Sequence, residues 1–345
     1  MKFQSIQALR AIAANAVLIA HLTVIERKYN RGALVLPKWV EGGVFGVVIF
    51  FVVSGFIMAS LAERNSKRFL INRTTRIFPP YWFYTTLVLA AALIRPDWVN
   101  SSYDQAPSIW RSYLLVPDTT FPILGVGWTL IHEMYFYIVF ALVIAIRLPQ
   151  VAAIAAWTVV ILLIWLLFPG EAGSPAYPIL STAVNPLTFE FMAGILVSLA
   201  LRRFNGRLAV AILTTGALGL TATVMFYPEP ISLTWGTGLW WRLILIGLPC
   251  AAVVYGIAGL DVKRAISFPA WVIRLGDASY STYLAHVLVA SALGRALMQV
   301  TFGGVLYEVI LVAICIVAAN LFGLISHALI EQPTVKIGRG LFRMT

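Results

Sequence analysis

The sequence predicts an all-α protein, a polytopic membrane helix bundle of about ten transmembrane helices with both termini cytoplasmic. Hydrophobic residues make up 60% of its 345 residues, and charged residues make up only 11%. A typical soluble protein carries about 25% charged residues. Apolar runs of about 20 residues, long enough to cross a bilayer as a helix, recur along the whole chain. We therefore expect one transmembrane domain over residues 1–345 and no separate soluble domain.

The apolar runs divide the chain into ten candidate spans. Because the first run contains Arg10 and lacks a small-x-small cleavage site after a clean apolar core, we interpret it as a retained span and not as a signal peptide. Pro79 and Pro80 are expected to begin the third span, and Pro333 is expected to stop the last helix. The candidate spans are 5–25, 41–62, 77–95, 125–146, 150–168, 183–201, 208–227, 237–259, 275–296 and 305–330.

Basic residues set the expected orientation. They follow the second, fourth, sixth and eighth spans, with Arg73, Arg147 and Arg202 among them, and they recur at the end of the chain. Lys and Arg concentrate in cytoplasmic linkers, so this side and the N-terminus are predicted to be cytoplasmic. One linker on the opposite side also contains basic residues, Arg27 and Lys28, and so does not follow this rule. The net charge of +11 is explained by membrane anchoring, and we expect no nucleic-acid partner.

Several classes of site have no sequence signal. Cys250 and Cys315 both lie inside apolar runs, which predicts neither a disulfide framework nor a metal site. No glycine-rich phosphate loop and no GxSxG elbow is present. We expect no metal and no permanently bound cofactor.

Arg10 and His21 occupy one face of the first span. At about 100° per residue, eleven residues are within about 20° of three full turns, and they separate the two side chains by roughly 16 Å along the axis. Ionisable groups inside a span usually face a protein interior or a cavity and are functional candidates. The alternative is that Arg10 reaches the inner headgroups and His21 simply bonds a neighbouring helix. For the aligned pair we favour function.

His132 and Glu133 lie about two turns into the fourth span from its outer end. A carboxylate beside lipid needs a partner, and His21 is available at a similar depth. A carboxylate is a standard means of orienting an imidazole as general base. The alternative is a buried polar network that only fixes helix register.

Arg73 and Arg76 are three residues apart, so they share a helical face at the cytoplasmic mouth, where a guanidinium pair suits phosphate groups. Membrane anchoring explains the same pair, and by spacing alone anchoring is the favoured explanation.

Ser54 and Gly55, in the second span, are small residues that allow close helix packing. In the ninth span Tyr283 and His286 lie one turn apart, either facing a cavity or bonding between helices.

Six short patterns follow one another along the chain: "RAIAANAVLIAH" for R-x10-H, "FFVVSGF" for FFVxSG, Arg73-Thr-Thr-Arg76 for RxxR, "GWTLIHEMYFY" for W-[ST]-L-x-x-E, "SYSTYLAH" for a tyrosine-rich segment ending in His, and "EQP" for E-x-P. In this order they resemble the acyltransferase-3 family of integral membrane proteins, especially its stand-alone exopolysaccharide acyltransferases. The likeness covers nearly the whole chain. One departure is Val48, where many relatives carry Asp before the paired phenylalanines.

The resemblance implies transfer of an acyl group, usually acetyl, from cytoplasmic acyl-CoA to a sugar hydroxyl of a surface glycan or its lipid-linked precursor, in the bacterial inner membrane. His21 would be the general base or acyl carrier, Glu133 would orient it, and Arg10 completes the catalytic set. Acyl-CoA, the co-substrate, would contact Arg73, Arg76, Ser54 and Gly55, and Arg10 is a further candidate for its phosphates. The acceptor cavity would be lined by Trp128, His132, Tyr283 and His286.

Two alternatives remain at this point. One is an enzyme that transfers succinyl or a longer acyl group, which depends on pocket volume. The other is a transporter or flippase for a lipid-linked or anionic solute. Transporters often show inverted repeats and paired broken helices, and neither is visible in the sequence.

Overall fold

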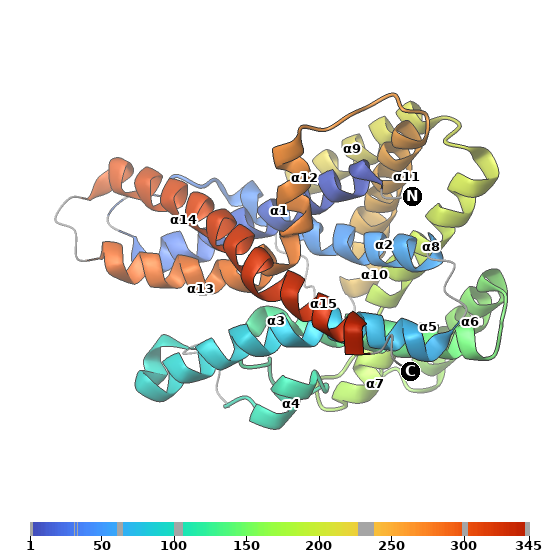
Figure 1. Cartoon of the computed structure of the whole chain (residues 1–345), viewed down its shortest axis with the longest axis horizontal. Coiled ribbons are helices and arrows are strands. Elements are labelled where there is room, and N and C mark those ends of the chain that lie inside the picture. The colour runs from blue at the N-terminus through green and yellow to red at the C-terminus, as the bar shows by residue number, and fades with distance from the viewer. Residues whose placement is uncertain are drawn as a thin grey trace. The chain divides into compact units, whose positions relative to one another are not determined.

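A computed structural model describes residues 3–30, 32, 34–60, 65–99, 106–226, 238–298 and 303–341. In these residues all regular structure is helical and there is no strand, which confirms the predicted all-α class (Figure 1). The predicted span ends at 62, 227 and 237 lie outside the described residues. The α-helices are α1 Gln4–Tyr29, α2 Phe45–Ser60, α3 Ser66–Ile94, α4 Ile109–Leu114, α5 Trp128–Ala145, α6 Gln150–Leu167, α7 Pro178–Ala183, α8 Leu187–Phe204, α9 Ala209–Phe226, α10 Gly238–Arg242, α11 Leu248–Val262, α12 Ala270–Asp277, α13 Ser279–Leu297, α14 Gly304–Ser326 and α15 Gln332–Leu341.

Nine helical segments in the described part of the chain are long and apolar enough to cross a membrane. They correspond to nine of the ten predicted spans. The remaining prediction, 275–296, is helical but is divided between α12 and α13, and α13 falls outside the nine. Its hydroxyl-rich first turns, His286 and Arg295 lower the hydropathy of this 19-residue helix.

Two predicted helix boundaries are wrong. α3 begins at Ser66 and continues through Pro79 and Pro80, so the proline pair lies inside a helix and does not start one. The start is fixed instead by the Asn65 side chain, which accepts a hydrogen bond from the Arg68 backbone N–H at 2.9 Å. Pro333 does not stop the last helix either. It lies inside a continuous helical run, directly after the π-helical turn His327–Glu331 that joins α14 to α15.

The chain forms two compact units, and each consists of separate stretches of sequence. The first unit contains Met1–Val53, Ala200–Ile231 and Ile244–Leu329. The second contains Ser54–Leu199, Ser232–Leu243 and Ile330–Thr345.

In the first unit α1 packs against α11, α12, α13 and α14, while α13 and α14 pack on each other (Figure 1). Small residues bring backbones close. A side chain at Gly43 or Gly46 would strike the carbonyl groups of Ala16 or Ala13 in α1. Asp261, near the end of α11, accepts hydrogen bonds from the Ser5 backbone N–H at 3.0 Å and from its hydroxyl at 2.7 Å, which anchors the start of α1. The core between α1, α13 and α14 consists of Leu18, Leu22, Ile25, Tyr29, Ala290, Tyr307, Leu311, Cys315 and Ala319.

The second unit has a core of aromatic rings. Phe136 of α5 stacks on Phe191 of α8 with ring centroids 4.2 Å apart, and on Trp157 of α6 at 5.8 Å. Offset aromatic stacking adds about 0.5–1.5 kcal/mol per pair beyond area burial. A side chain at Gly55 would strike the Phe191 carbonyl group, so glycine here lets α2 approach α8.

Candidate functional site

α1 carries Arg10 and His21 in one unbroken helix, so the eleven-residue spacing keeps both on one face. Arg10 is buried with 8% of its surface exposed. Its Nη1 donates to Gln7 Oε1 at 3.1 Å, one turn earlier. His21 is half-buried, and its Nδ1 lies 2.9 Å from the Val17 carbonyl oxygen.

His21 meets a second imidazole, that of His286 in α13. His286 Nε2 lies 3.3 Å from His21 Nδ1, and the ring centroids are 5.0 Å apart in an edge-to-face arrangement. His286 has 1% of its surface exposed. Its other nitrogen, Nδ1, lies 2.6 Å from the Tyr283 carbonyl oxygen. Two of the predicted cavity residues, Tyr283 and His286, are therefore grouped with His21.

Tyr283 extends this group toward α2. Its ring packs edge-to-face on Phe50 with centroids 5.9 Å apart, and lies 5.7 Å from the His286 ring. The first unit thus joins one residue of the R-x10-H pattern with two of the tyrosine-rich segment, although more than 260 residues separate them in sequence.

Glu133 lies on α5 in the second unit and is held by two hydroxyl groups. Ser54 donates to Glu133 Oε1 at 2.9 Å, and Tyr137 donates to the same oxygen from one turn further along α5. Hydrogen bonds to an ionised carboxylate are among the strong ones in proteins. The carboxylate that the sequence singled out is therefore oriented within its own unit. Its predicted pairing with His21, a residue of the other unit, stays a prediction.

Arg73 lies beside Glu133's partner Tyr137. Its guanidinium carbon is 5.9 Å from the Tyr137 ring centroid and 5.8 Å from that of Phe69. Stacking on two rings favours a guanidinium over an ammonium. Arg73 Nε is buried and has no hydrogen-bond partner among the described residues. Arg76, one turn later, is half-buried.

Trp128 and His132 line a pocket that is partly open to the surface. Their rings pack edge-to-face with centroids 5.8 Å apart. Aromatic, hydroxyl and carboxyl groups converge there, the mixture expected of a site for a polar ligand with apolar faces. The lining residues are Pro117, Asp118, Thr119, Thr120, Phe121, Pro122, Trp128, Ile131, His132 and Thr182.

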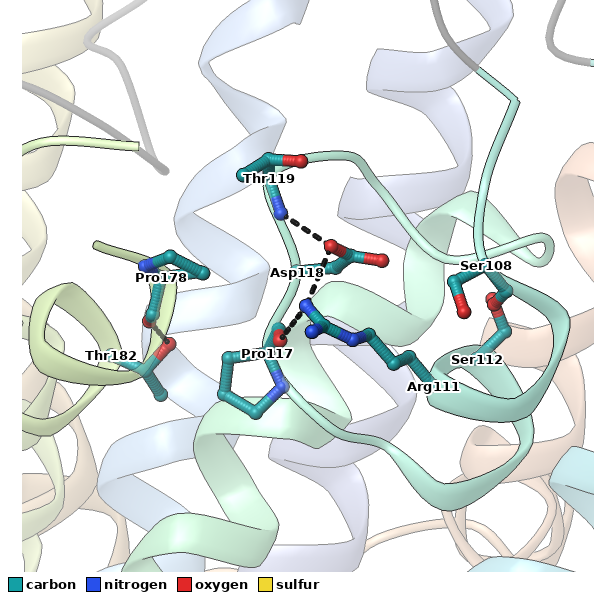
Figure 2. A network of polar contacts seen from close by, with 8 residues as sticks. All are labelled: Ser108, Arg111, Ser112, Pro117, Asp118, Thr119, Pro178 and Thr182. Carbon is teal, nitrogen blue, oxygen red and sulfur yellow. Dashed lines mark hydrogen bonds and ion pairs between the residues drawn. The ribbon is translucent and has the colours of Figure 1, made fainter. Parts of the chain in front are cut away.

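The loop wall of this pocket is held by a polar network (Figure 2). Arg111 of α4 donates to Asp118 Oδ1 at 2.8 Å, and the same oxygen accepts the Thr119 backbone N–H at 2.8 Å. Arg111 also reaches the Pro117 carbonyl at 3.4 Å. Tyr81 of α3 donates to the Ser112 carbonyl at 2.7 Å, which fastens α4 to the helices. The loop is thereby preorganised with one Asp118 oxygen already engaged.

Sequence reasoning missed two features of the second unit. Tyr137 lies four residues after Glu133, a spacing that faces it on a helix and that was available as a signal. Arg242 and Glu190 form a fully buried ion pair, with Arg242 Nη2 2.9 Å from Glu190 Oε1. An Arg and a Glu inside two predicted spans were the available signal, because buried charges need partners.

The predicted site residues therefore fall into two groups, one in each unit. Arg10, His21, Tyr283 and His286 belong to the first. The second contains Ser54, Gly55, Arg73, Arg76, Trp128, His132 and Glu133.

Known proteins similar to this chain include two from rhizobia and one from a streptomycete. The exopolysaccharide production protein ExoZ of Rhizobium meliloti is 28% identical over 86% of this chain and 91% of its own length. Nodulation protein 10 of Rhizobium leguminosarum is 27% identical over 96% of this chain and 93% of its own length. The acyltransferase MdmB of Streptomyces mycarofaciens is 26% identical over 98% and 92%. No solved structure matches.

The family comparison covers most of the chain. The model of the acyltransferase domain family known as acyltransferase-3 matches residues 3–326 and so includes every site residue described above. With nine apolar helices among the described residues, the chain is a multi-pass membrane protein. It belongs to the acyltransferase-3 family of membrane O-acyltransferases.

Proposed function

We propose that this protein transfers an acyl group, most simply acetyl, from cytoplasmic acyl-CoA to a sugar hydroxyl of an exopolysaccharide or its lipid-linked precursor in the bacterial inner membrane. Both termini are cytoplasmic in this proposal. The observation that carries it is the imidazole of His21. Its Nδ1 faces a backbone carbonyl, so Nδ1 bears the proton and Nε2 keeps a lone pair suited to a general base.

The chemistry is a single acyl transfer. His21 Nε2 removes the proton from the acceptor hydroxyl as its oxygen forms a bond to the acyl carbonyl carbon. The bond between that carbon and the CoA sulfur breaks, and the departing thiolate receives the proton from the His21 imidazolium. Every atom is accounted for without a metal.

The donor side is assigned to Arg73 and Arg76. The buried Arg73 Nε without a described partner supports an anionic ligand there, because an unsatisfied buried donor is costly. Phosphate groups of CoA supply several acceptor oxygens for such a guanidinium pair. Ser54 is engaged by Glu133, and Gly55 is explained by packing against α8, so their part in donor binding is indirect.

The acceptor side is assigned to the pocket beside Trp128 and His132. A sugar presents apolar ring faces and several hydroxyls, and this pocket offers rings together with Asp118 and threonine hydroxyls. The names of two relatives support this assignment, because ExoZ is an exopolysaccharide production protein and MdmB is an acyltransferase.

The test uses isolated membranes that contain the protein and the cell's surface glycans, supplied with acetyl-CoA labelled in the acetyl group. We expect label in the glycan and free CoA in equal amounts. His21→Ala at equal protein level should lose about 100-fold or more of this turnover. Full turnover in His21→Ala would remove His21 from the chemistry.

The same experiment separates the alternatives. A transporter or flippase leaves the thioester intact and releases no CoA. An enzyme for succinyl or longer groups releases CoA from those thioesters faster than from acetyl-CoA. Mass spectrometry of the glycans with and without the protein then gives the mass of the group added.

A further inference from the structure

Two backbone carbonyls settle the proton positions on the two contacting imidazoles. A carbonyl oxygen only accepts hydrogen bonds, so the nitrogen that faces it must carry the hydrogen. At His286 that nitrogen is Nδ1, which lies 2.6 Å from the Tyr283 carbonyl. At His21 it is also Nδ1, which lies 2.9 Å from the Val17 carbonyl.

The contact between the rings then has one consistent direction. Neutral His286 has its proton on Nδ1, so its Nε2 carries a lone pair, and this atom lies 3.3 Å from His21 Nδ1. The His21 Nδ1–H is thus shared between the Val17 carbonyl and His286 Nε2, a three-centre hydrogen bond. The opposite tautomer of His286 would place two N–H groups face to face.

We propose that His286 is a positioning residue for His21. Its buried Nε2 accepts the His21 Nδ1–H, which holds the His21 ring in place and keeps the lone pair on Nε2, the atom that meets the acceptor hydroxyl. This inference rests on the proposed function, in which His21 is the base.

The hydrogen-bond acceptor on His286, its Nε2, also stabilises the positively charged His21 ring that forms during the reaction. When His21 Nε2 takes the acceptor proton, the ring becomes an imidazolium with hydrogens on both nitrogens. Its Nδ1–H then becomes a stronger donor, and both acceptors that face it are already in place. A carboxylate performs this task in the familiar nucleophile–base–acid triads, and here a neutral imidazole fixed by its own helix performs it.

The experiment compares three substitutions of His286 in the full-length protein in membranes. The side-chain oxygen of Gln can reach the position of Nε2 and accept the His21 Nδ1–H. Asn places its polar atoms near Nδ1 and cannot reach His21, and Phe keeps the volume without an acceptor. We expect His286→Asn and His286→Phe to lower kcat tenfold or more, with KM for acetyl-CoA unchanged. His286→Gln should restore kcat to within a few fold of the original.

Two comparisons keep the result specific. In a His21→Gln background, His286→Asn should lower the residual turnover no further, because its effect acts through His21. Asn320→Leu is the packing control. It removes the contact between Asn320 and Asn15 of α1 without touching His21, and its kcat should be unchanged.

The outcomes separate this inference from the proposed function. The positioning role is overturned, and the proposed function stands, if all three His286 variants keep the original kcat while His21→Ala is inactive. Full activity of His21→Ala overturns the function itself. An equal loss of kcat in all three His286 variants also contradicts the assignment of the hydrogen-bond acceptor to His286 Nε2, provided that thermal denaturation in detergent shows each variant to be folded.

Discussion

The polar cluster around His21 and the polar cluster around Glu133 are held in different ways. In the first unit the imidazoles of His21 and His286 are fixed by carbonyl oxygens of their own helices, one turn back in the chain. In the second unit Glu133 is fixed by the hydroxyls of Ser54 and Tyr137, and Arg73 stacks beside it on the Tyr137 ring.

The first cluster consists of imidazole rings held by backbone carbonyls, and the second consists of a carboxylate and a guanidinium group held by side chains. A helix cannot move its own carbonyls away, so the His21 cluster keeps its tautomers as long as the helices last. Hydroxyls and guanidinium groups rotate, so the Glu133 cluster depends on its packing and is adjustable. The same contrast recurs in the helix-to-helix links, which are the amide pair Asn15–Asn320 in the first unit and the ion pair Glu190–Arg242 in the second.

The largest effect is expected from breaking the ion pair of the second unit. Arg242→Met leaves the Glu190 carboxylate buried without its cation and should cost about 3–5 kcal/mol of stability. The double variant Glu190→Gln, Arg242→Met should recover much of that loss. Thermal denaturation in detergent measures both. Equal stability of single and double variants would show that the charges are not coupled.

Substitutions at Glu133 and Ser54 test whether the carboxylate is the functional centre of the second cluster. Glu133→Gln keeps the shape and removes the charge, and a hydrogen bond to a charged group contributes about 1.5–3 kcal/mol. We expect a loss of turnover of about 10- to 100-fold. Ser54→Ala removes one of two donors and should lose less. The measurement is labelled acetyl transfer at equal protein level. If Ser54→Ala loses more than Glu133→Gln, the carboxylate is not the functional centre of this cluster.

The arginines sharpen the comparison within the second unit. Arg73→Lys replaces a planar group stacked on two rings, whereas Arg76 has no such described stacking. We expect the KM for acetyl-CoA to rise about tenfold in Arg73→Lys and by less in Arg76→Lys. Steady-state titration of acetyl-CoA gives both values. A rise confined to Arg76→Lys would move the donor phosphates away from Arg73.

The smallest effect is expected at the amide pair of the first unit. Asn320 Nδ2 donates to Asn15 Oδ1 at 2.7 Å, and the return bond measures 3.3 Å. Interhelical hydrogen bonds in membrane proteins average about 0.6 kcal/mol. Asn15→Leu should therefore destabilise the protein only slightly in the same thermal assay. A loss comparable to that of Arg242→Met would erase the contrast between the two units.

The sequence predicts the long helices well because a bilayer imposes one strong rule on their length and polarity. It predicts poorly where a helix breaks that rule. The span 275–296 was predicted from an apolar run, but the structure divides it between α12 and α13, and the polar first turns of α13 lower its hydropathy. The helix through Pro79 and Pro80 packs on α5 and α15, and no local pattern reveals these contacts.

The site was predictable in its parts and not in its pairings. His21 was visible because an imidazole inside an apolar run is unusual. Its contact with His286, 265 residues away, follows from how α1 and α13 pack, which periodicity does not give. Tyr137 followed from Glu133 by helical spacing, whereas the match between Glu190 and Arg242 depends on tertiary structure.

The proline pair inside α3 has a consequence for how that helix transmits force. Because proline has no N–H, the carbonyls of Thr75 and Arg76 lack the backbone bonds that a helix normally supplies. Two consecutive backbone hydrogen bonds of the helix are therefore missing immediately after Arg73. The part of α3 that carries Arg73 and Arg76 is therefore joined to the part that carries Tyr81 by a turn that bends more readily than the rest of the helix. The Tyr81 part is itself hydrogen-bonded to α4.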